Sequence, residues 1–364
     1  MIEDTKTVFI GCGSNLGHKQ RNILNAIALI NTKPSTSVSR CSSMYPTSPL
    51  SDRSQPEYLN GIIEIETALN PFELLKALQD IEKELGREKD GKWMSRTIDL
   101  DIIFYGNEVI DSSELTIPHK QMHLRSFVLD GMCQLEPEMQ HPVLKRTCRQ
   151  LNNRLGGGNY FIDTEKPALI EMSGPIGVGK TTLAEGLTRR FKGILLKEKY
   201  DENPYLPLVY EGRDDLALKS ELFFLENSLS ELRKDGLSSD NVYVADYIFE
   251  KSTIYPKLWL SSEDFKIFHD RYFEASGQVA TPTLIIDISD TAQNCLERIH
   301  TRSRKYEQDI TTDFLCKLAG EYEDILRNWK KSPIIRLDAS QYDFRNESCI
   351  DKLFDEIKYY VINQ

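Results

Sequence analysis

The feature that most constrains this chain of 364 residues is a glycine-rich segment at 174–181, which reads G-P-I-G-V-G-K-T. It follows an apolar run at 168–172 and precedes apolar residues at helical spacing between 183 and 187. A strand, a glycine loop and a helix in this order form a cradle, in which backbone N–H groups and the positive helix end face phosphate oxygens. The segment therefore predicts a site for ATP or GTP, with Lys180 on the β- and γ-phosphates and Thr181 on Mg²⁺. The residues expected against the nucleotide are Gly174, Gly177, Gly179, Lys180, Thr181 and Thr182.

The length of the chain and the central place of this loop indicate two domains, at roughly 100–200 residues each. A composition with 40% hydrophobic and 28% charged residues is that of an ordinary soluble protein. The net charge of -11 argues against a nucleic-acid or membrane partner. Seven Cys without a C-x-x-C pair fit reduced thiols. The N-terminus has no signal-peptide pattern and no stretch is long enough to span a bilayer, so we expect a cytoplasmic protein.

The first half alternates strand and helix patterns. A strand is expected at 7–10, and apolar residues at helical spacing follow at 23–30. Residues 58–67 alternate like a half-buried strand. Asn70 before Pro71 is a typical helix start, and Gly86 ends the apolar stripe of that helix.

Two carboxylates two residues apart carry the chemistry of this half. In a strand, Asp99 and Asp101 point to one face while Ile98, Leu100 and Ile102 point to the other. Such a pair can share two Mg²⁺ ions that hold a polyphosphate. The alternative is a solvated outer face of an antiparallel strand, which the spacing alone favours. Cations and an indole nearby shift the balance toward a site; they are Arg87, Lys89, Lys92, Trp93 and Arg96.

Five segments of the first 145 or so residues resemble the 6-hydroxymethyl-7,8-dihydropterin pyrophosphokinases of folate synthesis. They are G-S-N-L-G at 13–17, S-M-Y-P-T-S-P-L at 43–50, Q-P-E-Y-L-N at 55–60, W-M-S-R-T-I-D-L-D at 93–101 and I-P-H at 117–119. The resemblance implies a ferredoxin-like α+β plait with an antiparallel sheet. It also implies transfer of the β,γ-pyrophosphoryl group of ATP to the pterin hydroxymethyl group, with release of AMP.

The resemblance assigns roles to residues of this chain. Asp99 and Asp101 would hold two Mg²⁺ ions on ATP, and Lys89, Lys92 and Trp93 would belong to a mobile catalytic loop. The pterin pocket would be lined by Thr47, Leu50, Tyr58, Asn60 and Phe127. Phosphate groups would meet Arg87, Arg96, His119 and Arg125.

Three positions depart from this family. Glu114 stands where an Arg is frequent, Pro46 replaces another frequent Arg, and Lys120 follows His119 where an aromatic residue can occur. Since Glu114 would repel ATP, one phosphate contact is in doubt. A non-catalytic pterin- or nucleotide-binding module is therefore the alternative for this half.

A polar stretch with three consecutive glycines at 156–158 has the composition of a flexible joint. We expect a first domain at 1–150, a linker at 151–166 and a second domain at 167–364.

The second half reads as a parallel α/β sheet. Buried strand patterns at 242–246, 283–288 and 332–338 alternate with helical segments, so its sites should lie at the strand C-termini. Glu198, shortly after the strand-like run 193–196, suits a general base for an acceptor hydroxyl. Arg298, Arg302 and Arg304 form a basic segment that suits a phosphate lid, although a solvated helix face would carry similar residues.

Residues 168–364 are similar to the deoxynucleoside kinases, through the glycine loop, E-x-x-x-x-N-P at 198–204, the helix with Phe223, the segment 246–251 and the Arg-rich lid. The resemblance implies that Glu198 deprotonates the sugar 5′-hydroxyl and that Tyr210 touches the 3′-hydroxyl. It places Asp246 near Mg²⁺, with Arg302 and Arg304 over the phosphates. Each half would use ATP, with two Mg²⁺ ions in the first and one in the second.

Two residues of the second half depart from that family. Tyr247 stands where Arg commonly follows the carboxylate, and Glu221 stands at the base-reading position, where Gln is common. Because a carboxylate only accepts hydrogen bonds and guanine presents two adjacent donors, we expect a purine preference, with guanine as the first candidate.

Two other functions remain open for this half. A nucleoside monophosphate kinase shares the loop and lid but needs further Arg residues, for which Arg213 is the candidate. A GTPase switch is disfavoured because neither N-K-x-D nor D-x-x-G occurs. The expected partners are small-molecule substrates, and the resemblance to both families is compatible with a homodimer through the second half.

Overall fold

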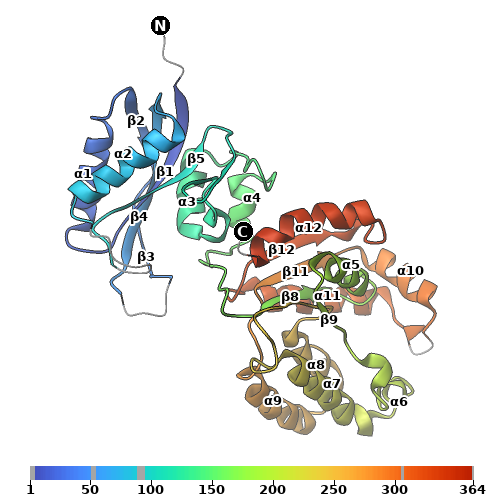
Figure 1. Ribbon diagram of the computed structural model, residues 1–364. Coiled ribbons are helices and arrows are strands. Elements are labelled where there is room, and N and C mark those ends of the chain that lie inside the picture. The colour runs from blue at the N-terminus through green and yellow to red at the C-terminus, as the bar shows by residue number, and fades with distance from the viewer. Residues whose placement is uncertain (1–4, 51–54, 88–94, 305–306, 363–364) are drawn as a thin grey trace. The chain divides into compact units, whose positions relative to one another are not determined.

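The structure is a computed structural model that describes residues 5–50, 55–87, 95–304 and 307–362. The chain divides into two compact units, Met1–Phe161 and Ile162–Gln364 (Figure 1). Each unit has its own sheet. The expected two-domain α/β architecture is confirmed.

The sheet of the first unit is antiparallel and has the order β2-β4-β1-β5, with β3 paired to β4. This order and the succession strand–helix–strand–strand–helix–strand are those of a ferredoxin-like plait, as expected. The elements of this unit are β1 (Lys6–Ser14), α1 (Lys19–Ile30), β2 (Thr36–Cys41), β3 (Tyr45–Thr47), β4 (Tyr58–Thr67), α2 (Pro71–Glu84), β5 (Asp99–Tyr105), β6 (Ile110–Asp111), β7 (Thr116–Ile117), the 3-10 helix η1 (Met122–Leu124), α3 (Ser126–Leu135) and α4 (Cys148–Asn153).

Helices cover both faces of this sheet. On one face, α1 and α2 pack against Ile63 and Ile65 of β4. On the other face, Gly131 of α3 lies so close to Ile62 that an added Cβ would come within 2.5 Å of its side chain. The expectation of a half-buried β4 is therefore wrong, because a second helical layer buries the face that the alternating pattern assigned to solvent.

The start of α2 shows how local sequence fixes an element that carries the site. The Asn70 side chain accepts from the N–H groups of Phe72 and Glu73, and Glu73 closes the capping box on the Asn70 N–H. After the helix, Gly86 has φ +84, a conformation that glycine adopts at little cost. Both ends of α2 agree with the expectation from sequence.

Residues 151–160 pack in the first unit and do not form a free linker. Leu151 and Leu155 are fully buried. The Ser126 hydroxyl at the start of α3 donates to the Gly158 carbonyl at 2.5 Å. The predicted hinge in the glycine triplet is therefore wrong, although the division between the units falls inside the predicted range 151–166.

The second unit has a five-stranded parallel sheet with the order β12-β11-β8-β10-β9. Each strand expected from sequence is present. The elements are β8 (Ala168–Ser173), α5 (Lys180–Phe191), β9 (Ile194–Leu196), η2 (Tyr200–Glu202), α6 (Leu206–Tyr210), η3 (Asp214–Leu216), α7 (Ala217–Leu232), β10 (Val242–Ala245), η4 (Phe249–Thr253), α8 (Tyr255–Trp259), α9 (Ser262–Ser276), β11 (Leu284–Ser289), α10 (Ala292–Arg302), α11 (Thr312–Arg327), β12 (Ile334–Asp338), η6 (Ala339–Gln341) and α12 (Glu347–Val361).

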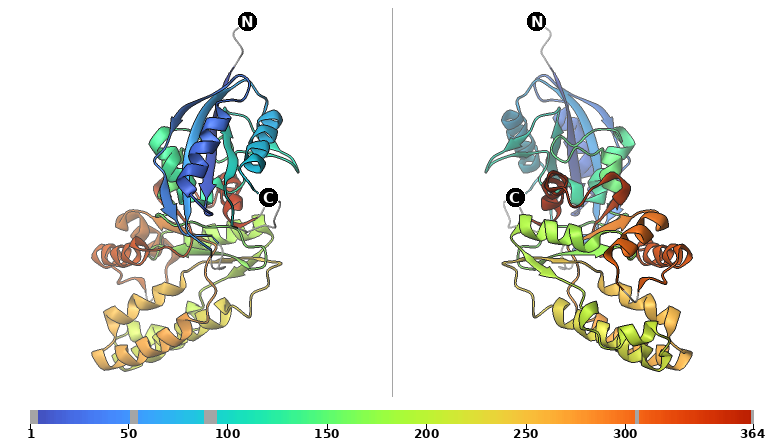
Figure 2. Two further views of the ribbon diagram at one scale, coloured as in Figure 1. Left: turned by 90° about the vertical axis from the view of Figure 1, so that its left-hand side faces the viewer. Right: turned by 90° about the vertical axis from the view of Figure 1, so that its right-hand side faces the viewer.

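Helices lie on both sides of this sheet, and Figure 2 shows α7 and α9 as a group apart from α12. Leu169 and Tyr243 of the sheet pack in one cluster with α7 and α9. Leu225, Leu229 and Phe268 of those helices complete the cluster. The strand C-termini are thereby left at an edge that loops and helix ends surround.

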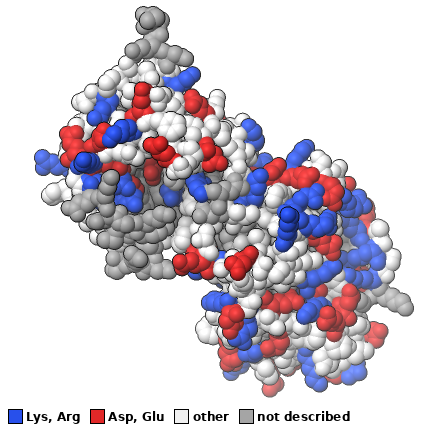
Figure 3. All heavy atoms as spheres, in the orientation of Figure 1, with Lys and Arg blue, Asp and Glu red and all other residues white. Residues whose placement is uncertain are grey.

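The surface carries charges of both signs. On the face in Figure 3, Lys and Arg are interspersed with Asp and Glu over both units. Among the described residues, none of the helices combines the length and the apolar character that crossing a bilayer requires.

Candidate active sites

The paired carboxylates of the first unit lie at the start of β5. Asp99 and Asp101 share one face of the strand, while Ile98, Leu100 and Ile102 are buried in the core on the other face. The Asp101 side chain is 44% exposed and the Asp99 side chain 24%. The sequence-based choice between a site and a solvated outer face thus turns on what surrounds the pair.

Two arginines hold Asp99. The Arg96 guanidinium donates to both carboxylate oxygens at 2.8 and 2.7 Å, and Arg87 lies 2.7 Å from one of them. Burial raises the pKa of the Asp99 carboxyl and Asp101 raises it further, while the two arginines oppose the shift. A cluster of cations and carboxylates of this kind is not a solvated strand face.

Glu82 of α2 anchors this cluster from below, and the sequence analysis did not identify it. Its Oε1 accepts from the Leu100 N–H at 2.7 Å and pairs with Arg87. Burial raises the pKa of the Glu82 carboxyl to about 7, against the effects of Arg87 and the Leu100 N–H. Glu82 occupies a buried position of α2, and the sequence pattern of that helix does not distinguish it from any other helical Glu.

The G-S-N-L-G segment fixes the backbone at Arg96. The Asn15 side-chain oxygen accepts from the Arg96 N–H at 2.6 Å, and the Asn15 N–H donates to the Arg96 carbonyl at 3.1 Å. The Asn15 amide group also donates toward Ser95 and Pro56. Asn15 is 2% exposed, so this segment acts as a brace for the site.

The residues predicted for a pterin pocket come from β3, β4 and the start of α3. The Asn60 amide group donates to the Thr47 hydroxyl at 2.6 Å, and the Tyr58 hydroxyl donates to Gln55. The Phe127 N–H is held by Asn159. Leu50, which follows β3, is half-buried.

Two further phosphate-binding candidates lie beside the carboxylates. His119 Nε2 is 3.9 Å from Asp101, and burial together with Arg125 lowers the pKa of His119 to about 3. Burial likewise lowers the pKa of Arg125. Arg125 Nε has no hydrogen-bond partner among the described residues, so this buried donor has capacity for an anion. Glu114 and Pro46 are exposed, and the predicted Lys89, Lys92 and Trp93 lie outside the described residues.

The second site is built on the glycine loop between β8 and α5. Gly174, Gly177 and Gly179 have φ of +132, +81 and +106. An added Cβ would come within 2.3 Å of the Ile288 carbonyl at Gly174 and within 2.5 Å of the Cys295 carbonyl at Gly177. These positions therefore require glycine on both conformational and steric grounds.

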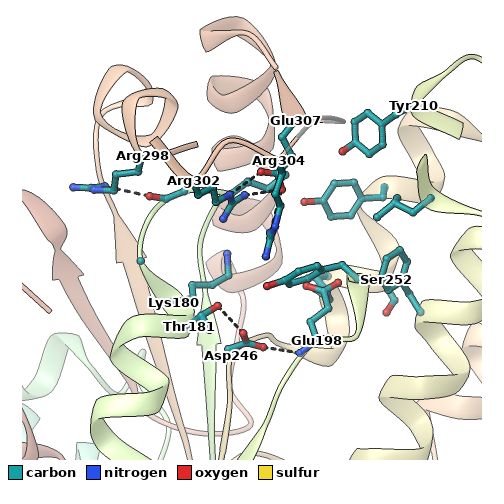
Figure 4. A pocket seen from close by; sticks show the side chains of 18 of the residues that line it. Lys180, Thr181, Glu198, Tyr210, Asp246, Ser252, Arg298, Arg302, Arg304 and Glu307 are labelled. Atoms are coloured by element: carbon teal, nitrogen blue, oxygen red, sulfur yellow. Dashed lines mark hydrogen bonds and ion pairs between the residues drawn. The ribbon is translucent and has the colours of Figure 1, made fainter. Parts of the chain in front are cut away.

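A cavity of about 310 Å³ opens above this loop and collects most of the residues predicted for the second half (Figure 4). Gly174 is absent from its wall, but its carbonyl accepts from Lys180 Nζ at 2.6 Å. Burial lowers the pKa of Lys180 to about 8. The predicted residues that line the cavity are Gly177, Gly179, Lys180, Thr181, Thr182, Glu198, Tyr210, Glu221, Asp246, Arg298, Arg302 and Arg304.

Asp246 at the end of β10 ties the loop to the predicted base. One carboxylate oxygen accepts from the Thr181 hydroxyl at 2.7 Å, and the other accepts from the Glu198 N–H at 2.9 Å. The hydroxyl and carboxylate oxygens that Mg²⁺ prefers are thus adjacent. Among the described residues, no group of three or more His, Cys, Asp or Glu side chains is arranged to hold a metal ion by itself, so further ligands would have to come from phosphate and water.

Arg302 and Arg304 lie over the cavity in Figure 4, and Arg298 points to its side. Glu307 accepts two hydrogen bonds of 2.7 Å each from Arg302. The Arg304 guanidinium lies 3.9 Å from the centre of the Tyr200 ring. Arg298 donates to the Gly177 carbonyl within the loop at 3.3 Å and forms an ion pair with Asp290. The alternative of a solvated helix face does not describe these contacts.

Trp259 and Lys251 also line the cavity, and no role was predicted for either of them from sequence. Tyr210 packs edge-on against Trp259, with 5.1 Å between ring centres, and both line the cavity. Lys251 forms an ion pair with Glu198 and also lines the cavity. Burial raises the pKa of Glu221 to about 8; Glu198 adds to the shift and Lys251 opposes it. Trp259 stands in no motif, and Lys251 ends the segment 246–251 without a role predicted for it.

Comparisons with known proteins assign each unit. A model of the 7,8-dihydro-6-hydroxymethylpterin-pyrophosphokinase family matches residues 9–137. The 2-amino-4-hydroxy-6-hydroxymethyldihydropteridine pyrophosphokinase of Bacillus subtilis (strain 168) is 40% identical over 161 residues, which are 43% of this chain and 96% of the relative. Its counterpart in Haemophilus influenzae is 40% identical over 136 residues, which are 37% of this chain and 85% of the relative.

A model of the deoxynucleoside kinase family matches residues 170–362. Among solved structures, a deoxyadenosine kinase from M. mycoides with bound dCTP covers 52% of this chain and 98% of its own, at 20% identity and a TM-score of 0.43. The chain thus belongs to the 7,8-dihydro-6-hydroxymethylpterin-pyrophosphokinase family through its first unit and to the deoxynucleoside kinase family through its second.

Proposed function

We propose that the chain is a bifunctional ATP-dependent transferase. Its first unit transfers the β,γ-pyrophosphoryl group of ATP to the hydroxymethyl group of 6-hydroxymethyl-7,8-dihydropterin and releases AMP. Its second unit transfers the γ-phosphoryl group of ATP to the 5′-hydroxyl of a deoxynucleoside and releases ADP. The observation that supports this proposal is that each unit gathers carboxylates and arginines: Asp99 lies with Arg87 and Arg96 in the first, and Asp246 lines one cavity with Arg302 and Arg304 in the second.

In the first unit, the oxygen donors of Asp99 and Asp101 suit two Mg²⁺ ions, whose chemistry is to neutralise the charge of a polyphosphate. Arg87 and Arg96 now lie on Asp99, and both can turn to phosphate oxygens when ATP arrives. His119 and Arg125 would contact further phosphate oxygens. We assign the same task to Lys89 and Lys92 and assign Trp93 to the ring face of the substrate.

The acceptor of this unit is a flat, polar heterocycle. Asn60 can satisfy both a donor and an acceptor edge of an aminopyrimidinone, and Tyr58 and Phe127 offer ring faces. Thr47 holds the Asn60 amide in place. Leu50 completes the proposed apolar wall.

In the second unit, Glu198 is the proposed general base. The proton of the 5′-hydroxyl passes to Glu198 as the oxygen bonds to the γ-phosphorus. The bond from that phosphorus to the bridging oxygen breaks, and its electron pair leaves on ADP. Lys180, Arg302 and Arg304 stabilise the charge of the transferring group, with one Mg²⁺ ion at Thr181 and Asp246. Thr182 and Arg298 would bind ATP.

We infer a purine preference from Glu221, with guanine as the first candidate base. Burial raises the pKa of this carboxyl to about 8, which favours its protonated form at neutral pH. The adjacent N1–H and amino donors of guanine would favour the carboxylate, so guanine binding should release a proton. Tyr210 would contact the sugar 3′-hydroxyl. Turnover on a panel of deoxynucleosides tests this preference, and faster pyrimidine than purine turnover would end it.

The alternative of a nucleoside monophosphate kinase has less support. Arg213, its candidate for a second phosphate, donates to both oxygens of Asp215 at 2.8 Å, and its side chain is 58% exposed. It is not part of the cavity wall.

For the first unit, the alternative is a binding module without catalytic activity. Incubation with ATP and the pterin alcohol distinguishes the two, because AMP formation means catalysis and its absence means a binding module.

A further inference from the structure

One buried lysine beside the base of the second unit has no assigned task. Lys251 lies in η4 and its side chain is 6% exposed. Its ammonium pairs with Glu198 Oε1 and faces the cavity. A buried ammonium is costly unless a partner compensates its charge, so this contact is a specific one and not the chance pairing of two surface side chains.

Lys251 occupies the place that the residue after Asp246 cannot fill. Tyr247 is 1% exposed, packs in the cluster formed with α7 and α9, and donates its hydroxyl to Glu231 at 2.8 Å. It therefore points into the core and brings no cation to the cavity. Its ring instead lies 5.1 Å from Lys251 Nζ, and the Phe224 ring lies 5.7 Å from the same atom. Two ring faces thus help to hold the ammonium in place.

The charges around Glu198 make this lysine decisive. Lys180 donates to the Gly174 and Pro175 carbonyls at 2.6 and 2.9 Å, and its side chain is committed to the loop. Asp246 holds the Glu198 N–H and adds negative charge, and Glu221 faces Glu198 from α7 without adding a positive charge. The hydroxyls of Tyr255 and Tyr322 also interact electrostatically with Glu198, and they bring no positive charge. Among the described residues, Lys251 is the cation that forms an ion pair with Glu198.

We propose that Lys251 is the positioning residue of the acceptor site: it holds the Glu198 carboxylate beside the nucleoside hydroxyl, in place of a cation directly after Asp246. The proposal rests on the phosphorylation of a deoxynucleoside by the second unit. A misplaced base lowers the rate of the chemical step more than it weakens ATP binding, because ATP is held by the glycine loop and the lid. Loss of Lys251 should therefore act on kcat for the nucleoside reaction.

The test compares full-length wild type with Lys251→Met, Lys251→Arg and Lys331→Met. Lys331 is a matched control, since it pairs with Glu250 of the same η4 at 2.8 Å but is 59% exposed and outside the cavity wall. We expect Lys251→Met to lower kcat at least about 100-fold with KM for ATP changed less than about threefold. The kcat of Lys251→Arg should be at least about tenfold higher than that of Lys251→Met, and the kcat of Lys331→Met should equal that of wild type. If Lys251→Met does not fold, Lys251→Gln replaces it. AMP formation by the first unit of the same chain measures how much active full-length protein each sample contains.

Two results would overturn the proposal. One is a kcat for Lys251→Met within about threefold of wild type, and the other is a loss that Lys251→Arg does not recover, since then the charge is not what matters. A wild type that phosphorylates no deoxynucleoside refutes the proposed function itself and, with it, the role of Lys251. The wild-type measurement alone shows that outcome, so the two failures are distinguishable.

Discussion

Asp99 and Asp101 share one face of β5 but differ in what else they hold. Asp99 fixes Arg87 and Arg96, so its replacement would also release two guanidinium groups. Asp101 is the more exposed of the two and can be changed at lower structural cost. Its replacement therefore isolates the proposed metal-binding role.

Asp101→Asn should lower AMP formation from ATP and the pterin alcohol by roughly 10²–10³-fold, the scale of losing one preorganised electrostatic contact. The thermal transition and the kinase activity of the second unit should stay unchanged. Asp101→Glu keeps the charge and serves as the matched variant. An Asn variant with wild-type AMP formation would remove Asp101 from the site.

Glu221 predicts how stability of the second unit depends on pH. Its pKa is raised to about 8 in the fold from 4.5, so between these values the unfolded chain loses its proton first. The stabilising contribution is complete below pH 4.5 and is lost as pH rises toward 8. Gln at position 221 does not ionise, so the Glu221→Gln variant lacks this pH-dependent loss of stability. The free energy of unfolding of the variant minus that of wild type should therefore rise by a few kcal/mol between pH 5 and pH 8. Denaturant unfolding at both pH values measures the difference, and an equal offset at both would contradict it.

At the scale of residues, the sequence allowed prediction of the site residues that stand in motifs. It did not allow prediction of those that reach the site through the packing of a helix. Asp99, Lys180 and Asp246 stand in motifs with a chemical meaning of their own. Glu82 and Lys251 reach their partners only because α2 and η4 are folded against the strand ends. No spacing in the sequence distinguishes Glu82 from other helical Glu residues, and the segment 246–251 points to Lys251 without indicating its contact with Glu198.

The glycine loop is the element on which the second site depends. Gly177→Ala would place a methyl group within 2.5 Å of the Cys295 carbonyl at φ +81, so the backbone must shift. We expect kcat/KM for ATP in the kinase reaction to fall about 10²-fold, because shifts of about 1 Å have effects of that size.

Gly320→Ala in α11 is the matched control for the loop. Nothing lies within 4 Å of the Cβ it would add, and alanine favours a helix over glycine by roughly 0.5–1 kcal/mol. It should keep full kinase activity and raise the thermal transition of the second unit slightly. Equal activities of the two variants would contradict the role given to Gly177.

At the scale of elements, local signals predicted each strand of the parallel sheet and both ends of α2. They failed where burial comes from distant residues. The alternation in β4 could not reveal that α3 covers its second face, and the composition of 151–160 could not reveal that Leu151 and Leu155 complete the first core.

At the scale of the whole molecule, the division after Phe161 predicts where the chain can be cut. A fragment of residues 1–161 should keep pyrophosphokinase activity. A fragment of residues 1–150 lacks the buried Leu151 and Leu155, whose burial contributes roughly 1.5–3 kcal/mol each. Its thermal midpoint should lie about 10 °C lower. Calorimetry of both fragments measures the two midpoints. Equal midpoints would show that the first domain ends at residue 150, as expected from the sequence.

Product analysis of the full-length protein tests the central claim, that two ATP-dependent sites act on two acceptors. ATP and Mg²⁺ are supplied with the pterin alcohol, with a deoxynucleoside, or with neither, and the nucleotides are separated. The account predicts AMP with the pterin alcohol, ADP with the deoxynucleoside, and little of either without an acceptor. The absence of AMP in the first mixture or of ADP in the second would contradict the function assigned to that unit.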